Sequence, residues 1–159
     1  MPNSALHLVF GVIENEEPRA REGDDCTGNT RRIRLAYQLI HSPHVPSLFV
    51  DFLSIQNNTF VGIGIESDLK KLVEDYGFGY YANAVDLRKL TADKYQMKEL
   101  KNAGLKKLAR FVLEKWVEKP KRVTLSRWDY TWLTHVQVQY ACTDSFVSYE
   151  IGRVLNAAE

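Results

Sequence analysis

Short apolar runs and helical apolar stripes follow one another along this chain, and their order predicts an α/β fold. Residues 59–65 form a run rich in β-branched side chains, which predicts a buried strand. Residues 67–77 follow almost without a gap and carry apolar side chains at helical spacing, with Ser67 as the expected N-cap and Gly77 as the expected C-cap. A strand that leads directly into an amphipathic helix is typical of α/β units.

The other apolar segments of the first half extend this prediction. Strands are expected at residues 6–12 and 33–39, and a short strand is expected at residues 84–87. A short helix is expected at residues 45–53, with Pro46 in its first turn. The order of these elements agrees with a sheet that is flanked by helices.

Two amphipathic helices are predicted in the second half of the chain. The inward face of the first consists of Leu105, Leu108, Ala109, Val112 and Trp116, and Pro120 is expected to end this helix. The second helix spans residues 136–155, and its inward stripe consists of Val136, Val147, Ile151 and Val154. With 159 residues, no internal repeat and no interdomain linker, the chain is expected to form a single domain over residues 1–159.

Residues 14–32 differ from the rest because they contain ten charged side chains and almost no apolar ones. Such a segment is too polar to pack, so it is predicted to be a loop. Its position between the strands at 6–12 and 33–39 indicates an insertion in a hairpin.

Charge is spread unevenly along the chain. Residues 94–127 contain eleven basic and three acidic side chains, which gives this segment a charge of +8 and leaves −7 for the remainder. A basic block attracts phosphate backbones, but a solvated helix face is the commoner explanation. No apolar run is long enough to span a membrane, and two distant cysteines are typical of a reducing compartment. We therefore expect an intracellular protein of the nucleus or cytoplasm.

The most informative polar position is Asp144. It follows Tyr140 by four residues, so a helix places the phenol and the carboxylate on one face, along the inward stripe. A carboxylate on such a face needs a partner, because burial without one is unfavourable. A metal ion is one such partner, and a neighbouring backbone amide is the other.

Four segments carry a resemblance to a known family. They are residues 59–68, residues 85–88, residues 104–110, and Trp128 together with residues 139–144. In this order and spacing they resemble the exonuclease domain of the Werner syndrome protein and its plant relatives. Those proteins belong to the wider 3′-5′ exonuclease superfamily, which includes ribonuclease D.

The resemblance implies a ribonuclease H-like mixed sheet flanked by helices. It also implies four carboxylates that bind two divalent cations, Mg²⁺ or Mn²⁺, for phosphodiester hydrolysis. Position by position, Asp68 matches the second-motif acid of the family, and Tyr140 and Asp144 match the third motif. Asp68 and Asp144 would bind metal, and the Tyr140 hydroxyl would orient the attacking water. The implied partner is nucleic acid, as a single strand or a 3′ end.

The first motif of the family, Asp-x-Glu on the opening strand, has no match. In one interpretation, residues 6–12 replace that strand and leave Glu14 and Glu16 as a displaced acidic pair. In the interpretation that we favour, residues 3–8 correspond to the second strand of the family, and the opening central strand is missing. The sheet would then close up, or another chain would fill the gap in a homo- or hetero-oligomer.

Three functions therefore stay open at this point. The chain is a metal-dependent 3′-5′ exonuclease, a structural subunit that packs with an intact relative, or a catalytically inactive nucleic-acid-binding module. For the last of these, the predicted binding face consists of Lys101, Lys106, Lys107 and Arg110. Cleavage that requires metal, stable hetero-oligomers, or salt-sensitive binding without cleavage would distinguish them.

Overall fold

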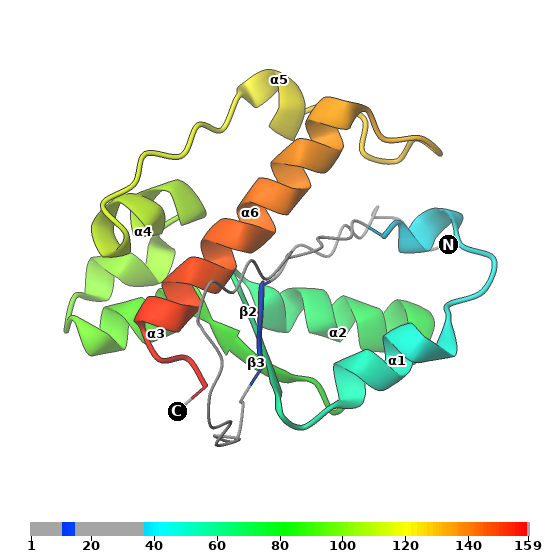
Figure 1. The fold of residues 1–159 in the computed structure, drawn as a ribbon, viewed down its shortest axis with the longest axis horizontal. Helices are drawn as coiled ribbons and strands as arrows, with labels where there is room; N and C mark the ends of the chain where they lie inside the picture. Colours follow the sequence, from blue (N-terminus) through cyan, green and yellow to red (C-terminus); the bar gives the residue numbers. More distant parts are fainter. Residues whose placement is uncertain (1–10, 15–36, 159) are drawn as a thin grey trace, which may run out of the picture.

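The computed structural model describes residues 11–14 and 37–158 (Figure 1). The strands in these ranges are β1 (Gly11–Glu14), β2 (Asn58–Gly62) and β3 (Asn83–Asp86). The helices are α1 (Ser47–Ser54), α2 (Ile65–Tyr76), α3 (Leu87–Lys94), α4 (Leu105–Val112), α5 (Lys121–Thr124) and α6 (His135–Val154). The two 3-10 helices are η1 (Leu39–His41) and η2 (Lys98–Asn102).

The central strand of the described sheet is β2. It pairs antiparallel with β1, so that Gly11 lies opposite Val61 and Glu14 lies opposite Asn58. It pairs parallel with β3, and α2 forms the connection between these two strands. The predicted mixed α/β sheet is therefore confirmed, while the ribonuclease H-like arrangement with a missing opening strand stays a prediction.

Two apolar clusters pack on opposite sides of β2. Phe60 belongs to the cluster formed with α1 and α2, whereas Val61 belongs to the cluster formed with α3, α4 and α6. Successive strand residues point to opposite faces of a sheet, so these helices cover both faces. Figure 1 shows α6 crossing the sheet, where it packs against β1 and β2. This packing fixes the position of the helix that carries Tyr140 and Asp144.

Local sequence explains where the two helices with predicted site residues begin or end. Gly77 follows α2 with a φ of 72°, a left-handed conformation that glycine adopts without strain, and it is the C-cap that we predicted. The helix α6 begins with a capping box, in which the Thr134 hydroxyl and the Gln137 side chain each accept a hydrogen bond from the other residue's backbone N–H. Both devices supply partners for backbone groups that have none inside the helix.

Some predicted helix features are wrong. Ser67 does not cap α2, because the apolar Ile65 already joins the first turn after Gly64. The first predicted helix of the second half, which corresponds to α4, ends at Val112 instead of extending to Pro120. Trp116 therefore lies outside it and is 62% exposed.

The predicted inward stripe of α6 is only partly buried. Val147 and Ile151 are in the core, as predicted, but Val136 and Val154 are exposed at the two ends of the helix. The sheet and its covering helices are shorter than α6, so the ends of its apolar stripe extend past the core. The predicted helix at residues 45–53 and the strand at 84–87 correspond to α1 and β3.

Several predictions fall wholly or partly outside the described residues. These are most of the strand at 6–12, most of the polar loop at 14–32, and the first part of the strand at 33–39. In the described part of the last segment, Leu39 begins the 3-10 helix η1 rather than ending a strand. None of the described helices combines the length and apolar character that a membrane crossing requires.

Candidate functional site at the third motif

Tyr140 and Asp144 lie one turn apart on α6, and both side chains are partly buried. The helix therefore presents the phenol and the carboxylate to one region, as the spacing predicted. The pKa of the Tyr140 phenol is raised, mainly by burial. Asp144 raises this pKa further, whereas the contact with Lys119 lowers it in part. The hydroxyl consequently keeps its proton at neutral pH and can serve as a hydrogen-bond donor.

The partner of the Asp144 carboxylate is Lys119, which lies in the segment between α4 and α5. Its ammonium donates a hydrogen bond to Asp144 Oδ2 at 2.7 Å, and the two side chains are only 25% and 15% exposed. The same ammonium lies 5.3 Å from the centroid of the Tyr140 ring. Burial alone would lower the pKa of Lys119, but its contacts with Asp144 and Tyr140 outweigh this effect and raise it. Lys119 is therefore charged and contacts both residues of the predicted motif.

The second carboxylate oxygen of Asp144 is in a different situation. Oδ1 is buried and, within residues 37–158, it has no hydrogen-bond partner. Buried carboxylate oxygens are nearly always hydrogen-bonded, so an exception at a predicted ligand requires an explanation. A cation that binds at this carboxylate would satisfy the oxygen.

Trp128 holds Tyr140 in place from outside the helix. Its indole N–H donates a hydrogen bond to the Val123 carbonyl at 3.1 Å, and its ring lies 6.0 Å from the Tyr140 ring at an interplanar angle of 60°. A ring pair at this separation favours a defined orientation of both partners. These contacts agree with a positioning role for Trp128 beside the last helix.

Asp68 lies in the first turn of α2, on a different helix from Tyr140 and Asp144. Burial raises the pKa of the Asp68 carboxyl, and Lys71 opposes the shift only in part. Within the described residues, no group of three or more His, Cys, Asp or Glu side chains is arranged to bind a metal. Among the described side chains, the unpartnered Oδ1 of Asp144 leaves one position for a cation, whereas a centre for two cations is not formed.

The register of the sheet shows where Glu14, one of the two acids of the proposed displaced pair, lies relative to Asp68. Glu14 lies opposite Asn58, at the beginning of β2, whereas Asp68 follows the end of that strand. Four strand residues separate these two ends, a distance of roughly 13 Å. The backbone at Glu14 is thus at the wrong end of β2 to place a carboxylate beside Asp68. Glu16 lies outside the described residues.

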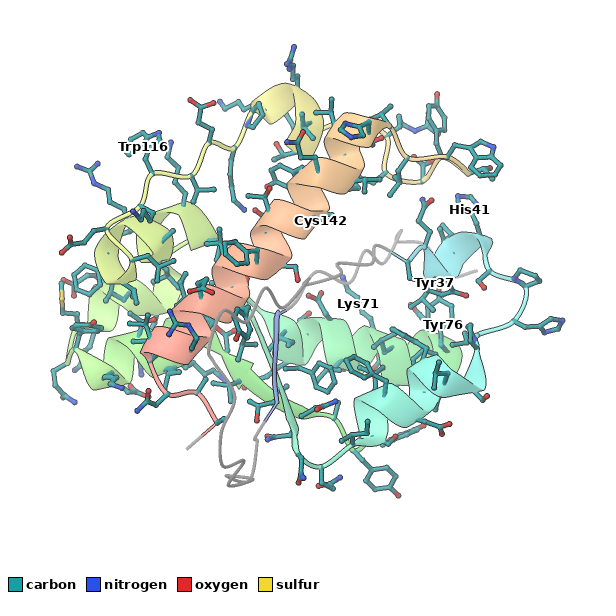
Figure 2. The ribbon with its side chains drawn as sticks, in the orientation of Figure 1. Tyr37, His41, Lys71, Tyr76, Trp116 and Cys142 are labelled. Atoms are coloured by element: carbon teal, nitrogen blue, oxygen red, sulfur yellow. The ribbon has the colours of Figure 1, made fainter. Side chains whose placement is uncertain are left out.

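The four predicted nucleic-acid-binding residues do not form one uniform face. Lys101 forms a long ion pair of 3.6 Å with Asp93, and Lys107 is exposed on α4. Lys106 and Arg110 instead lie over the Trp116 ring, 4.3 and 5.2 Å from its centroid. Figure 2 shows Trp116 at the outer edge of the molecule, above α4. These three side chains, which we call the Trp116 platform, combine exposed positive charge with an exposed aromatic ring.

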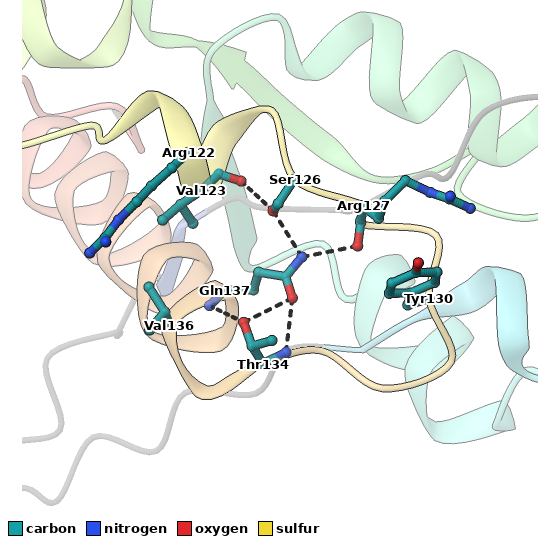
Figure 3. Close-up of a pocket in the computed structure, with 8 residues that line it drawn as sticks. All are labelled: Arg122, Val123, Ser126, Arg127, Tyr130, Thr134, Val136 and Gln137. Atoms are coloured by element: carbon teal, nitrogen blue, oxygen red, sulfur yellow. Dashed lines mark hydrogen bonds between the residues drawn. The ribbon is translucent and has the colours of Figure 1, made fainter.

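A surface pocket of about 430 Å³ lies between α5, its following loop and the start of α6 (Figure 3). Its walls are Arg122, Val123, Ser126, Arg127, Tyr130, Thr134, Val136 and Gln137. The buried Gln137 amide donates to Ser126 Oγ and to the Arg127 carbonyl, and its oxygen accepts from Thr134. These hydrogen bonds hold the start of α6 in place. Asp68, Tyr140 and Asp144, the three predicted catalytic residues, are not among the residues that line this pocket.

Sequence reasoning missed Lys119 as a member of the site. It is 25 residues from Asp144 along the chain and belongs to a run of basic residues that has no helical period. The excess of positive charge in residues 94–127 was the available signal, but it does not distinguish Lys119 from its neighbours Lys115 and Lys121.

Residues 36–157 match the model of the 3′-5′ exonuclease family. An Arabidopsis thaliana 3′-5′ exonuclease is 36% identical over 103 residues, which are 64% of this chain and 35% of that protein. The human exonuclease 3′-5′ domain-containing protein 2 is 31% identical over 116 residues, 73% of this chain and 18% of that protein. The chain belongs to the 3′-5′ exonuclease family, and it spans about a third or less of these two relatives.

Among solved structures, the EXD2 exonuclease domain soaked in Mn and Mg is 29% identical to this chain. The match covers 74% of this chain and 58% of that one, with a TM-score of 0.32.

Proposed function

We propose that this domain acts on the 3′ ends of single-stranded nucleic acid, with Asp68, Tyr140 and Asp144 as the residues that serve hydrolysis. The observation that carries the proposal is the arrangement of the third motif, in which Tyr140 and Asp144 share a partly buried position with an unsatisfied carboxylate oxygen. Family membership supports it, because the matched segment includes all three residues.

The residues would contribute in different ways. Asp144, and Asp68 from α2, would hold a divalent cation, Mg²⁺ or Mn²⁺. Such a cation activates water and stabilises charge on the phosphate when it is present. The protonated Tyr140 hydroxyl would orient the attacking water, and Trp128 would keep the phenol in position. A site with so few carboxylates is expected to depend on substrate phosphates as further ligands and to be slow.

Degradation of 5′-labelled single strands with Mn²⁺ tests this proposal. DNA and RNA of one sequence should be compared for the wild type, Asp144→Asn, and the control Asp129→Asn, which changes an exposed carboxylate paired with Arg127. We expect a stepwise ladder that disappears in Asp144→Asn and persists in Asp129→Asn. A folded wild type that leaves both strands intact would refute hydrolysis by this chain.

A second candidate function is binding of single strands without cleavage, and the Trp116 platform favours it. An exposed indole with two cations above it offers a stacking surface for a base and positive charge for the adjoining phosphates. The platform requires no metal, so it would work even if the third motif were inactive.

Fluorescence anisotropy with a labelled single strand of about 20 nucleotides tests the second candidate at several salt concentrations. Loss of one stacked base is worth about 1–3 kcal/mol, so Trp116→Ala should weaken binding at least fivefold. Trp132→Ala is the matched control, because Trp132 is 85% exposed but lies outside the platform. Equal affinities of the two variants would exclude the platform as the binding surface.

A further inference from the structure

The ion pair of Lys119 with Asp144 is one of two described ion pairs whose side chains are largely covered, the other being that of Arg88 with Asp86. The bridges of Lys70 with Glu74 and of Lys89 with Glu66 have side chains that are more than half exposed, whereas Lys119 and Asp144 are largely covered. Water and salt screen exposed pairs, but they screen a covered pair much less. The charge of Lys119 is therefore screened less than that of an exposed lysine when another cation approaches Asp144.

The ammonium of Lys119 occupies the position beside Asp144 Oδ2 that a cation bound through this oxygen would take. It contacts Asp144 Oδ2 directly and lies over the ring of Tyr140, so it touches both motif residues at once. A divalent cation on the same carboxylate would meet a like charge a few ångströms away. Asp144 can be paired with the ammonium through Oδ2, or it can use both oxygens for a metal after the lysine has moved.

We propose that Lys119 is an internal counter-ion that competes with divalent metal for Asp144, so that metal binds only when the lysine side chain leaves the carboxylate. This inference rests on the proposed metal-binding role of Asp144, and it concerns how that site is controlled. It accounts for the partly satisfied state of the carboxylate, in which one oxygen is paired and the other has no partner within residues 37–158.

The position of Lys119 in the chain makes such an exchange feasible. It precedes Pro120, the N-cap of the short helix α5, and the segment from 113 to 120 contains no helix or strand. The lysine side chain is long and flexible, so its ammonium can leave Asp144 without a change in α6. A phosphate group of a bound strand offers it a new anionic partner.

Titration of Mn²⁺, followed by the electron paramagnetic resonance signal of the free ion, tests the proposal without any nuclease assay. The variants are Lys119→Met, which removes the charge, Lys119→Arg, which keeps it, and the control Lys121→Met, which removes an exposed charge two residues away. An opposite unit charge within about 4–6 Å changes the acid dissociation constant of a carboxyl group by tenfold or more, and a comparable effect is expected on its affinity for a cation. We therefore expect Lys119→Met to bind Mn²⁺ at least tenfold more tightly than the wild type, Lys119→Arg and Lys121→Met.

The gain must depend on Asp144. In Lys119→Met/Asp144→Asn the tighter binding should disappear, and Mn²⁺ should raise the melting temperature of Lys119→Met more than that of the double variant. Unchanged Mn²⁺ affinity in Lys119→Met, or a gain that survives Asp144→Asn, would overturn the proposal. If Lys119→Met does not fold without metal, Lys119→Gln replaces it in the same comparison.

The Mn²⁺ titration and the nuclease assay test different claims, so the competition and the hydrolysis can fail independently. Tighter Mn²⁺ binding by Lys119→Met with no cleavage of any strand supports the competition and refutes hydrolysis. A wild type that degrades DNA or RNA, together with unchanged Mn²⁺ affinity in Lys119→Met, supports hydrolysis and refutes the competition.

Discussion

The Asp86 carboxylate accepts a hydrogen bond from the Gly64 backbone N–H at 2.8 Å, and this contact ties the end of β3 to the start of α2. The same carboxylate caps α3 through the Arg88 backbone N–H and pairs with the Arg88 guanidinium at 2.9 Å. The Asp86 carboxylate is therefore the N-cap of α3. One buried carboxylate thus joins the end of β3 to the starts of α2 and α3.

Asp86→Asn should destabilise the protein by about 2–3 kcal/mol at pH 7, because hydrogen bonds to a charged group are lost in a buried position. Burial would raise the pKa of Asp86, but the hydrogen bonds from Arg88 and Gly64 outweigh it and lower that pKa below its usual value. This contribution is present above pH 4, about the pKa of the unfolded chain, and is lost as the pH falls through the folded pKa.

Urea denaturation at pH 7 and at a series of pH values down to 3 measures this effect. The difference between the wild type and Asp86→Asn should shrink below pH 4, whereas Asp93→Asn, which changes a carboxylate that is 70% exposed, should differ little from the wild type throughout. A difference that is the same at pH 3 and pH 7 would contradict the linkage.

Gly64→Ala should destabilise the protein more than Gly77→Ala. Both glycines have a φ near 70°, where any other residue incurs about 1–2 kcal/mol of strain. A Cβ at Gly77 would meet nothing within 4 Å, but a Cβ at Gly64 would lie 3.2 Å from the Arg88 guanidinium that Asp86 holds. Thermal or urea denaturation of both variants measures the difference, which should vanish when Arg88 is also changed to alanine.

Thr134→Ala should lower the free energy of unfolding by about 0.5–2 kcal/mol, because it removes the N-cap of α6. The matched control is Thr143→Ala, since Thr143 is exposed in the middle of the same helix and its hydroxyl donates to the Gln139 carbonyl one turn earlier. Circular dichroism during urea denaturation measures both changes. Thr134→Ser keeps the hydroxyl and should restore most of the stability, and equal losses in the two alanine variants would argue against the cap.

Ile151→Ala should destabilise the protein by about 2–5 kcal/mol, because Ile151 is fully buried in the cluster that joins α6 to α3 and α4. Val154→Ala changes an exposed apolar residue one turn later and should have little effect. Guanidinium denaturation compares the two. A small effect of Ile151→Ala would mean that the C-terminal half of α6 does not depend on this cluster.

The sequence pattern was sufficient for the elements whose hydrophobic period is long and uninterrupted. It predicted α6 within one residue at each end and the C-terminal Gly77 of α2, although it placed the start of α2 too late. It failed at Trp116, which fits the helical period but lies beyond the end of α4, with an exposed ring beside two cations. Periodicity cannot distinguish an aromatic ring in the core from an exposed ring that lies beside charged side chains.

The candidate site could be predicted only where its residues share one helix. Tyr140 and Asp144 are four apart, so their common face follows from helix geometry. Lys119 and Trp128 reach the same site from irregular segments, and their approach depends on how residues 113–134 pack on α6. Such contacts have no period in the sequence, and only the folded chain brings them together.

The antiparallel pairing of β1 also sets an order of assembly. Paired residues of β2 and β3 are 24 positions apart, whereas those of β1 and β2 are 44 to 50 apart. Closing the longer loop loses more chain entropy, so we expect the β2–α2–β3 unit to form first and β1 to join last. Amide hydrogen exchange should then be slower in β3 than in β1. During transient opening, the free edge of β2 would be a place where a strand of another chain could pair.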